Sequence, residues 1–445
     1  MRPVHLPEIA ERIERLPLSR WHLMVRLLIG TATLFDGFDQ LLISYALPVL
    51  QRQWGFGQAT ATLLITAGAV GMLVGALLAG TLADTIGRIR AVVACIVLYS
   101  VPSLLMAFVD DPQTFMVLRF VQGVGIGGEV LAAAVYMSEI VGAARRGRFV
   151  LRYEVVFAAG LLCAALVSSW VIPAWGWRPL FVIGAAPVLL VFPLLRWVPE
   201  SPRWLAARGS ARTEAVMARI EAATAASAIV APPESPAVEP EQAEPVARGR
   251  YARRTVVLAV VCLSAFLVNY ALSSWMPAIY TGLFKVPLAD ALRYSLYSMV
   301  ASFLGAGVLA IVVDRAGRRI SLAVGLAGAG AALAVLALTG PRDGGLVAVF
   351  VTVSSLFISA TNIGLYLYVP ELCPTRARAL GSSVAGVFIR LGVIVGPILV
   401  GVLSTGFTGF SVALGVLAAV GMLAAIVLIV FGEETTARRL EELSP

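Results

Sequence analysis

Charged side chains are scarce in this chain of 445 residues, and their scarcity excludes most soluble folds. Asp, Glu, Lys and Arg make up 13% of the residues, whereas hydrophobic residues make up 59% and the mean hydropathy is +0.89. A soluble domain normally carries about 25% charged residues. The sequence therefore predicts an integral membrane protein.

Lysine, histidine and cysteine are also rare, and each shortage argues against a class of function. The only lysine is Lys285, and both histidines, His5 and His22, precede the first apolar run. The four cysteines are scattered without a CxxC pair, so we expect buried fillers and no metal site. The net charge of +8 comes from arginines in short loops, a distribution that does not favour nucleic-acid binding. We predict no cofactor, no metal and no enzyme, because no P-loop and no nucleophile–histidine–acid set occurs.

Twelve long apolar runs occupy most of the chain. Each has about the 20 residues that a helix needs to span a bilayer. They lie near residues 25–49, 59–83, 91–109, 113–138, 152–173, 179–198, 255–278, 291–313, 320–339, 345–369, 380–404 and 409–431. A polar gap divides them into six and six.

The arginines orient these runs. With the N-terminus in the cytoplasm, 27 of the 34 basic residues fall in cytoplasmic segments and five in outer loops, while Arg119 and Arg390 lie within spans. Cytoplasmic loops carry such an excess of positive residues. We predict a multi-pass protein of the plasma membrane with both termini cytoplasmic, in the inner membrane if the source is a Gram-negative bacterium.

The gap between the two sets of runs predicts a linker. It contains APPESPAVEPEQAEPVARGR (231–250), which cannot bury enough apolar area to order itself. The stretch ARTEAVMARIEAATAA (211–226) before it can form an amphipathic surface helix. The predicted organisation is a cytoplasmic N-terminal segment (1–24), a six-helix bundle (25–205), a cytoplasmic linker (206–254), a second six-helix bundle (255–431) and a cytoplasmic tail (432–445).

Three motifs of the first half recur in the second half. LADTIGRIR (82–90) returns as VVDRAGRRI (312–320), shifted by 230, and SEIVGAARRGR (138–148) returns as PELCPTRARALG (370–381), shifted by 232. VPESPRW (198–204) has a weaker echo in FGEETTARR (431–439). All three fall on the cytoplasmic side in both halves, so the two bundles run in the same direction, related by an axis along the membrane normal.

These motifs resemble those of the major facilitator superfamily over nearly the whole chain. GALLAGTLADTIGR (75–88) resembles its loop between helices two and three, and PESPRWL (199–205) and PELCPTRARALG resemble sugar-porter and organic-ion signatures. RFVQGVGIGGE (119–129) resembles the fourth helix of nicotinate transporters, and DGFD (36–39) the first helix of aromatic-acid:proton symporters. The resemblance implies an all-α membrane protein with twelve transmembrane helices in two pseudo-symmetric six-helix bundles. We also predict a monomer that transports by alternating access.

Acids and arginines recur at the cytoplasmic helix ends and form a candidate gating network. Its members are Asp84, Arg88, Glu139, Arg148, Glu200 and Arg203 in the first half and Asp314, Arg318, Glu371 and Arg378 in the second. The expected pairs are Asp84 with Arg88, Glu139 with Arg145 or Arg148, and Glu200 with Arg203. As ordinary surface pairs they would contribute little. The resemblance implies latches between the bundles, closed when the transporter faces outward.

Five charged residues lie within the predicted spans: Asp36, Asp39, Arg119, Glu129 and Arg390. Each costs about 2.5–3.5 kcal/mol at a helix centre, so such residues usually face the protein interior and have partners. Static salt bridges between helices are one explanation. However, the three acids exceed the two arginines by one, and burial favours the neutral form of an extra carboxyl group, as a proton carrier requires.

The resemblance also implies roles for these charges. In related symporters the acid at the Asp39 position pairs with the arginine at the Arg119 position. We therefore predict that Asp39 couples the proton and Arg119 modulates it, with Asp36 or Glu129 as the alternative carrier. Arg390, in FIRLGVIVGP, resembles the cationic anchor of organic-anion transporters, and a guanidinium can hold a carboxylate through two parallel hydrogen bonds.

Aromatic and amide side chains within the spans are the remaining candidates for the substrate site. They are Tyr270, Asn269, Trp275, Tyr297, Tyr366 and Gln122. Packing explains any single tyrosine equally well, but together they favour a planar aromatic ligand over a sugar, which would need more amides. We predict proton-coupled uptake of a small organic anion such as nicotinate or a related aromatic carboxylate. Sugar or polyol:proton symport, organic-cation or drug:proton antiport, and a receptor that does not translocate stay open as alternatives.

Overall fold

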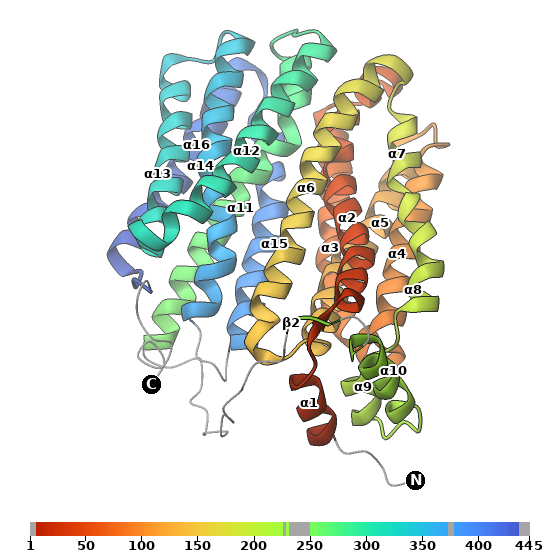
Figure 1. Ribbon diagram of the computed structural model, residues 1–445. Helices are drawn as coiled ribbons and strands as arrows, with labels where there is room; N and C mark the ends of the chain where they lie inside the picture. The colour runs from red at the N-terminus through yellow and green to blue at the C-terminus, as the bar shows by residue number, and fades with distance from the viewer. Residues whose placement is uncertain (1–5, 226–227, 231–249, 373–377, 436–445) are drawn as a thin grey trace. The chain divides into compact units, whose positions relative to one another are not determined.

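The computed structural model describes residues 6–225, 228–230, 250–372 and 378–435, which are mainly helical (Figure 1). The elements are α1 (Leu6–Glu14), β1 (Leu18–Ser19), α2 (Arg20–Trp54), α3 (Gln58–Ile86), α4 (Arg88–Met106), α5 (Pro112–Glu139), α6 (Ala143–Trp175), α7 (Arg178–Gly184), the 3-10 helix η1 (Ala186–Leu190), α8 (Val191–Trp197), α9 (Pro202–Ala207), α10 (Thr213–Ala225), β2 (Ala228–Val230), α11 (Arg250–Gly282), α12 (Leu288–Ala316), α13 (Arg318–Thr339), α14 (Gly344–Leu372), α15 (Arg378–Leu403) and α16 (Gly406–Phe431).

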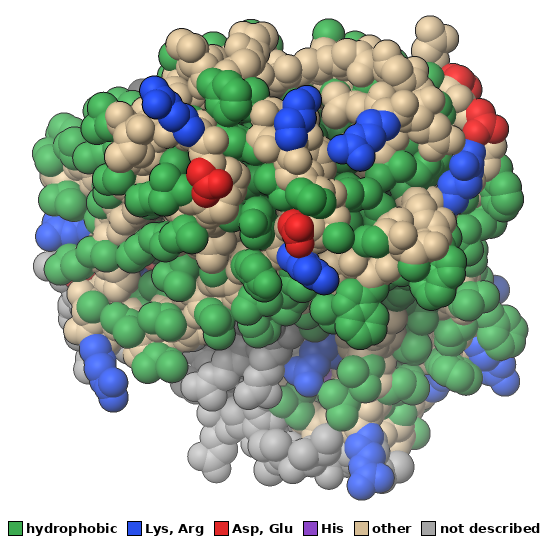
Figure 2. Space-filling view, turned by 90° about the horizontal axis from the view of Figure 1, so that it is seen from above, with side chains coloured by type: hydrophobic (Ala, Val, Ile, Leu, Met, Phe, Trp, Pro, Cys, Tyr) green, Lys and Arg blue, Asp and Glu red, His purple; other side chains and the backbone are tan. Residues whose placement is uncertain are grey.

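Within the described residues, twelve helical segments are long and apolar enough to cross a membrane. They fall in α2 to α6, in the run from α7 to α8, and in α11 to α16. Every apolar run predicted from the sequence is therefore helical, within a few residues at each end. Figure 2 shows hydrophobic side chains over most of the face that it displays, with charged side chains at scattered points.

Contacts divide the chain into two compact units. Unit 1 comprises Met1–Gln40, Val70–Ala164 and Arg178–Pro240, and unit 2 comprises Leu41–Ala69, Ala165–Trp177 and Glu241–Pro445. The predicted bundles, 25–205 and 255–431, are continuous stretches of chain, whereas each unit combines separate segments. The predicted boundaries therefore stay a prediction. The site residues divide between the units, so each unit has its own candidate site.

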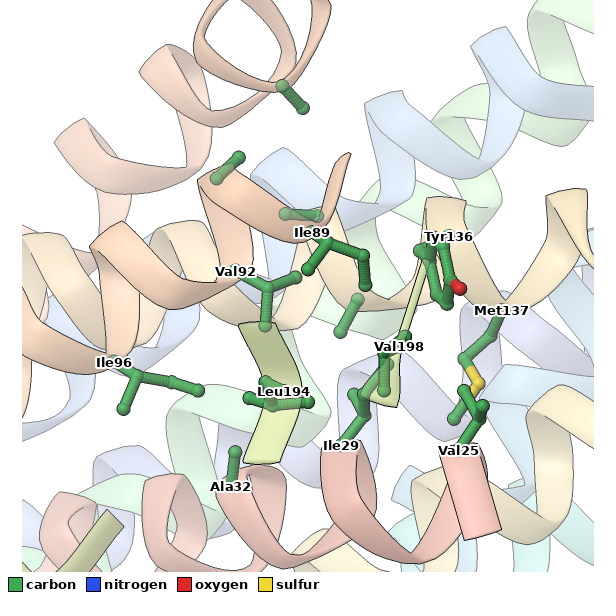
Figure 3. Close-up of a cluster of buried hydrophobic side chains, with 14 of the residues drawn as sticks. Val25, Ile29, Ala32, Ile89, Val92, Ile96, Tyr136, Met137, Leu194 and Val198 are labelled. Carbon is green, nitrogen blue, oxygen red and sulfur yellow. The ribbon is translucent and has the colours of Figure 1, made fainter. Parts of the chain in front are cut away.

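Unit 1 contains an apolar core between α2, α4, α5 and α8. Figure 3 shows Ile29, Val92, Tyr136 and Leu194 meeting there from these four helices, and all four are fully buried. Helices α3 and α5 approach so closely at Gly75 that a β-carbon there would lie 2.0 Å from the carbonyl oxygen of Val124 on α5. The absence of a side chain is thus required for this packing, which fixes the helix that carries Arg119 and Glu129.

The sixth predicted span is broken. Helix α7 ends at Gly184, a 3-10 turn follows over Ala186–Leu190, and α8 begins at Val191. Pro187 in the turn and Pro193 in α8 lack the N–H that a continuous α-helix would use, which explains the interruption. The break exposes the end of α7 to the interior of unit 1.

A small cap of α1, α9 and α10 gathers at one end of unit 1 (Figure 1). Its apolar contacts join Ile9 and Ile13 of α1 to Ala206 of α9 and Met217 of α10. Strand β1 pairs antiparallel with β2 beside it. The amphipathic helix predicted from residues 211–226 is confirmed as α10, and its apolar face packs in this cap.

Unit 2 holds the six long helices α11 to α16. Helix α11 packs against α15 and α16, α12 against α14, and α13 against both α14 and α16 (Figure 1). The backbones of α11 and α15 are closest at Gly392 and Gly396, where a β-carbon would lie 2.6 and 2.4 Å from the carbonyl oxygens of Leu263 and Leu267. Arg390 lies two residues before Gly392 on α15, and its electrostatic neighbour is Tyr366 of α14.

Candidate functional site

Glutamates cap the first turns of α4 and α13 in the same way. Glu200 Oε1 accepts hydrogen bonds from the main-chain N–H groups of Arg88 (2.8 Å) and Ile89 (3.1 Å). The carboxylate of Glu434 accepts from the first two N–H groups of α13, at 2.8 and 3.2 Å. A carboxylate satisfies free N–H groups there and is attracted to the positive end of the helix dipole.

The glycine before each helix makes this capping possible. Gly87 has φ 107° and Gly317 has φ 90°, a region that residues with side chains rarely adopt. A β-carbon would lie 2.3 Å from Glu200 at the first glycine and 2.6 Å from Glu434 at the second. The motifs at 82–90 and 312–320 therefore share a turn as well as a sequence.

The charged network is paired within each unit. Arg88 lies 2.5 Å from Asp84 and 3.2 Å from Glu139, and Arg318 lies 3.4 Å from Glu371. The predicted pair of Asp84 and Arg88 is thus present. Glu139, for which Arg145 or Arg148 was expected, meets the α4 arginine that also binds Asp84.

Other members of the predicted network have partners that the sequence did not indicate. Arg203 lies 3.5 Å from Glu14 of α1, while Glu200, its expected partner, caps α4. The side chains of Arg148, Asp314 and Arg378 lie outside the described part of the structure. The described contacts brace each unit, and a latch between the bundles stays a prediction.

Asp39 lies sealed inside unit 1, with 0% of its surface exposed. Its Oδ1 is 3.5 Å from the hydroxyl of Ser103, which also lies 3.0 Å from the carbonyl oxygen of Phe181 on α7. At Gly184, the last residue of α7, a β-carbon would be only 2.1 Å from Oδ1. The broken span therefore packs its end directly against this carboxylate.

Arg119 of α5 supplies the positive charge near Asp39. Its Nη1 donates to the main-chain oxygen of Asp39 at 3.2 Å and to Oε1 of Gln122, one turn further along α5. The guanidinium and the Asp39 carboxylate attract each other, although no direct salt bridge joins them among the described side chains. Gln122, predicted for the substrate site, belongs to this group in unit 1.

Asp36 of α2 and Glu129 of α5 form a second acidic group in the interior of unit 1. Both are 0% exposed, and their carboxyl groups interact directly. No donor among the described residues reaches either oxygen of Asp36. The hydroxyl of Thr33, one turn before Asp36, lies 3.4 and 3.5 Å from the two oxygens of Glu129.

Arg390 of α15 lies within a span of unit 2. It is half-buried, and its Nη1 donates to the main-chain oxygen of Gly386 in its own helix at 3.2 Å. No acid among the described residues pairs with it, and its electrostatic neighbour is Tyr366 of α14. Tyr366 meets Phe266 of α11 edge-to-face, with ring centres 6.4 Å apart. Phe266 in turn stacks on Tyr270 at 6.4 Å.

The other predicted substrate residues of unit 2 have different surroundings. Trp275 is 2% exposed and donates its indole N–H to the carbonyl oxygen of Pro397 at 2.8 Å, so it packs α11 onto α15. Tyr297 is 56% exposed on α12. Asn269 lies next to Tyr270 on α11, and its main-chain oxygen accepts from Ser273. None of these described contacts reaches Arg390.

Three residues that were not predicted contact the buried acids: Thr33, Ser103 and Gly184. Thr33 had a signal, since it precedes Asp36 by three residues and so shares its helix face. Ser103 is one of few polar residues in its apolar span. Gly184 had none, because only the fold places the end of α7 against Asp39.

Comparison with known proteins identifies the family. The sequence model of the family described as Major Facilitator Superfamily matches residues 29–342 and 292–444. The chain belongs to the major facilitator superfamily. A relative is the niacin transporter NiaP of Acinetobacter baylyi, 30% identical over 98% of this chain and 99% of that protein. The gallate transporter of Pseudomonas putida is 27% identical over 91% of each chain.

A solved structure shows the same fold. The xylose transporter XylE of E. coli, in a partially occluded inward-open conformation, superposes with a TM-score of 0.70. The match covers 95% of this chain and 100% of that one at 19% identity, so the likeness concerns the fold alone. The predicted twelve-helix major facilitator fold is confirmed, and this major facilitator protein is a multi-pass membrane transporter.

Proposed function

We propose that this transporter moves a small aromatic carboxylate, such as nicotinate, together with a proton by alternating access. Relatives named as niacin and gallate transporters support an aromatic acid as the cargo. The proposal sets the protein in the plasma membrane with both termini in the cytoplasm, in accordance with the distribution of arginines.

The surroundings of Arg390 are the observation that supports the proposal most directly. It is a half-buried cation within a span, and no acid among the described residues neutralises it. A guanidinium in such surroundings gains most from a carboxylate that can accept two parallel hydrogen bonds. Tyr366, which is 43% exposed, adds an aromatic surface beside it, against which a pyridine or benzene ring can pack. Phe266 and Tyr270 are buried and support the Tyr366 ring.

The buried acids of unit 1 supply the proton carrier in this proposal. Asp36, Asp39 and Glu129 are fully buried there, and of the three only Asp39 has a cation, Arg119, as an electrostatic partner among the described residues. Protonation of this group reduces the negative charge that would repel an incoming carboxylate, so proton and substrate bind favourably together. The paired charges at 84, 88 and 139, with their counterparts at 318 and 371, act as latches that open and close during the cycle.

A thermal-shift experiment on purified protein tests the cargo. We expect nicotinate at 100 times its dissociation constant to stabilise the wild type by about 2.7 kcal/mol. Arg390→Ala should lose this stabilisation and Arg390→Lys should retain part of it, because lysine keeps the charge but not the fork of donors. Arg293→Ala is the matched control, since that arginine is 64% exposed in the same unit and pairs with Asp290. Full stabilisation of Arg390→Ala by nicotinate, or stabilisation of the wild type by hexoses instead, would contradict the proposal.

A further inference from the structure

The three buried acids of unit 1 are not equivalent. Asp39 has Arg119 as an electrostatic partner and the hydroxyl of Ser103 at 3.5 Å. Asp36 has no such partner, and neither of its oxygens receives a hydrogen bond from a donor among the described residues. Both of its oxygens are nevertheless fully buried. An ionised carboxylate in that position would lack both a counter-charge and hydrogen bonds.

The group that Asp36 faces is another carboxyl group. Glu129 of α5 interacts with it directly, and Glu129 is also 0% exposed. The other titratable groups around Asp36 are Cys95 of α4 and Asp39 on its own helix. No cation of the described residues faces this pair.

The surroundings of the pair are apolar. Ala32 and Tyr99, both fully buried, belong to the same core cluster as Ile126, one turn before Glu129. The hydroxyl of Tyr99 donates to the carbonyl oxygen of Ala32 at 3.4 Å. The hydroxyl of Thr33 lies 3.3 Å from the carbonyl oxygen of Ile29 and 3.4 Å from Glu129, and neither oxygen of Asp36 receives a hydrogen bond from it.

We infer that Asp36 and Glu129 share one proton and form a proton-binding site distinct from the group of Asp39 and Arg119. Two adjacent carboxyl groups in a medium of low polarity cannot both be ionised. One proton between them converts two acceptors into a donor and an acceptor, which gives Asp36 the hydrogen bond that it otherwise lacks. The proton changes the net charge of the pair from −2 to −1.

The pair of Asp36 and Glu129 is a different proton carrier from Asp39, which was predicted from the sequence. Asp39 has the Arg119 guanidinium as a counter-charge, whereas Asp36 and Glu129 have none among the described residues. The shared proton of Asp36 and Glu129 is the one that the cycle can release and recover. That last statement rests on the proposed function, but the presence of the proton does not. The two are therefore tested by separate measurements.

Infrared spectroscopy of the purified full-length protein tests the shared proton directly. We expect the carbonyl stretch of a protonated carboxylic acid at neutral pH in the wild type. The band should disappear in the double variant Asp36→Asn/Glu129→Gln and persist in Asp39→Asn, the matched control three residues away on the same helix. If the double variant does not fold, the single variants answer instead, because each replaces one partner and should shift the band. A wild type without the band, or a band that these substitutions leave unchanged, overturns the inference.

Transport by the same variants tests whether this proton is the coupled one. In proteoliposomes Asp36→Asn and Glu129→Gln should lose accumulation of nicotinate driven by a pH gradient but retain exchange of labelled for unlabelled nicotinate, since each amide resembles a protonated carboxyl group. Accumulation retained in both variants would remove the coupling role. A wild type that does not transport nicotinate at all would count against the proposed function, and the infrared result would still decide the shared proton.

Discussion

Gly184 lies where a side chain would displace the carboxylate of Asp39. A methyl group there would be 2.1 Å from Oδ1 of Asp39 and 2.8 Å from Oγ of Ser103, far inside van der Waals contact. We expect Gly184→Ala to reduce proton-coupled uptake about 10- to 100-fold, because misplacing a working group by an ångström has costs of this order. Uptake assays under a pH gradient measure the effect. Gly176→Ala is the control for expression and folding, since no atom lies within 4 Å of that position although its φ of 77° strains an alanine. Unchanged uptake by Gly184→Ala would show that the position of Asp39 is unimportant.

Burial of the charged residues within the spans could be predicted from the sequence, whereas the pairing of Asp39 with Arg119 came from the family resemblance and the pairing of Asp36 with Glu129 had no signal. A charge within an apolar span must face the interior, and Asp36, Asp39 and Glu129 are all fully buried. Which of them meets Arg119 depends on how α2 rotates against α5, and helical spacing does not determine that rotation. Trp275 shows the same limit, since its aromatic ring indicated a ligand contact and its N–H in fact binds a backbone carbonyl.

At the scale of elements, Glu200 and Glu434 are N-terminal caps supplied by distant segments. Replacing Glu200 by Ala should cost about 0.5–2 kcal/mol, the usual cost of a lost cap, and Glu434→Ala should do the same for α13. Amide exchange in the first turn of α4 or α13 should therefore become about 2- to 30-fold faster. Glu8→Ala is the control, because Glu8 is exposed on α1. Equal exchange in all three variants would mean that these glutamates do not stabilise the helix ends.

An arginine of α1, Arg12, joins α1 to α10 in the small cap that α1, α9 and α10 form at one end of unit 1. Arg12 of α1 lies 2.8 Å from Glu214 and 2.7 Å from Glu221 of α10. Each partly exposed pair contributes up to about 1 kcal/mol. Arg12→Ala should therefore speed amide exchange across α1, whereas Arg15→Ala should not, because Arg15 pairs within α1 itself and is 76% exposed.

The same contact predicts a pH dependence. Hydrogen bonds from Arg12 lower the pKa of the Glu221 carboxyl group below its ordinary value. A depressed pKa in the folded cap means that the contact stabilises fully above the ordinary glutamate pKa of about 4.3 and is lost as the pH falls through the lowered folded value. Proteolysis of α1 should thus be slow at neutral pH and accelerate only in acid. Acceleration already between pH 6 and 7 would contradict this account.

The number and positions of the apolar spans followed from the sequence, whereas contacts between distant elements did not. An apolar run of about 20 residues predicts a helix by itself, and all twelve were confirmed. The break between α7 and α8 had a signal in Pro187 and Pro193, which the hydrophobicity of the run concealed. The pairing of α1 with α10 joins residues more than 200 positions apart, and no local pattern indicates it.

At the scale of the whole chain, the internal repeat is also a repeat of contacts. Tyr136 donates its hydroxyl to the carbonyl oxygen of Pro199 at 2.8 Å, and Tyr368 donates to that of Glu433 at 2.6 Å. Together with the caps at Glu200 and Glu434, these bonds show that the part of the weak echo formed by Pro199 and Glu200 and by Glu433 and Glu434 is also a repeat of contacts. The buried acids have no such counterpart in the predicted second bundle, where Arg390 is the charge within the spans. The repeat thus accounts for the scaffold, and the departures from it carry the proposed chemistry.

The most direct measurement of the central claim is nicotinate uptake by the wild type in proteoliposomes under two separate driving forces. One proton moving with one monovalent anion transfers no net charge, so a pH gradient should drive up to about tenfold accumulation per pH unit. A membrane potential alone should drive none, although a single charge would gain about 2.3 kcal/mol per 100 mV. Accumulation that follows the potential, or that is indifferent to the pH gradient, would contradict proton-coupled transport of an aromatic carboxylate.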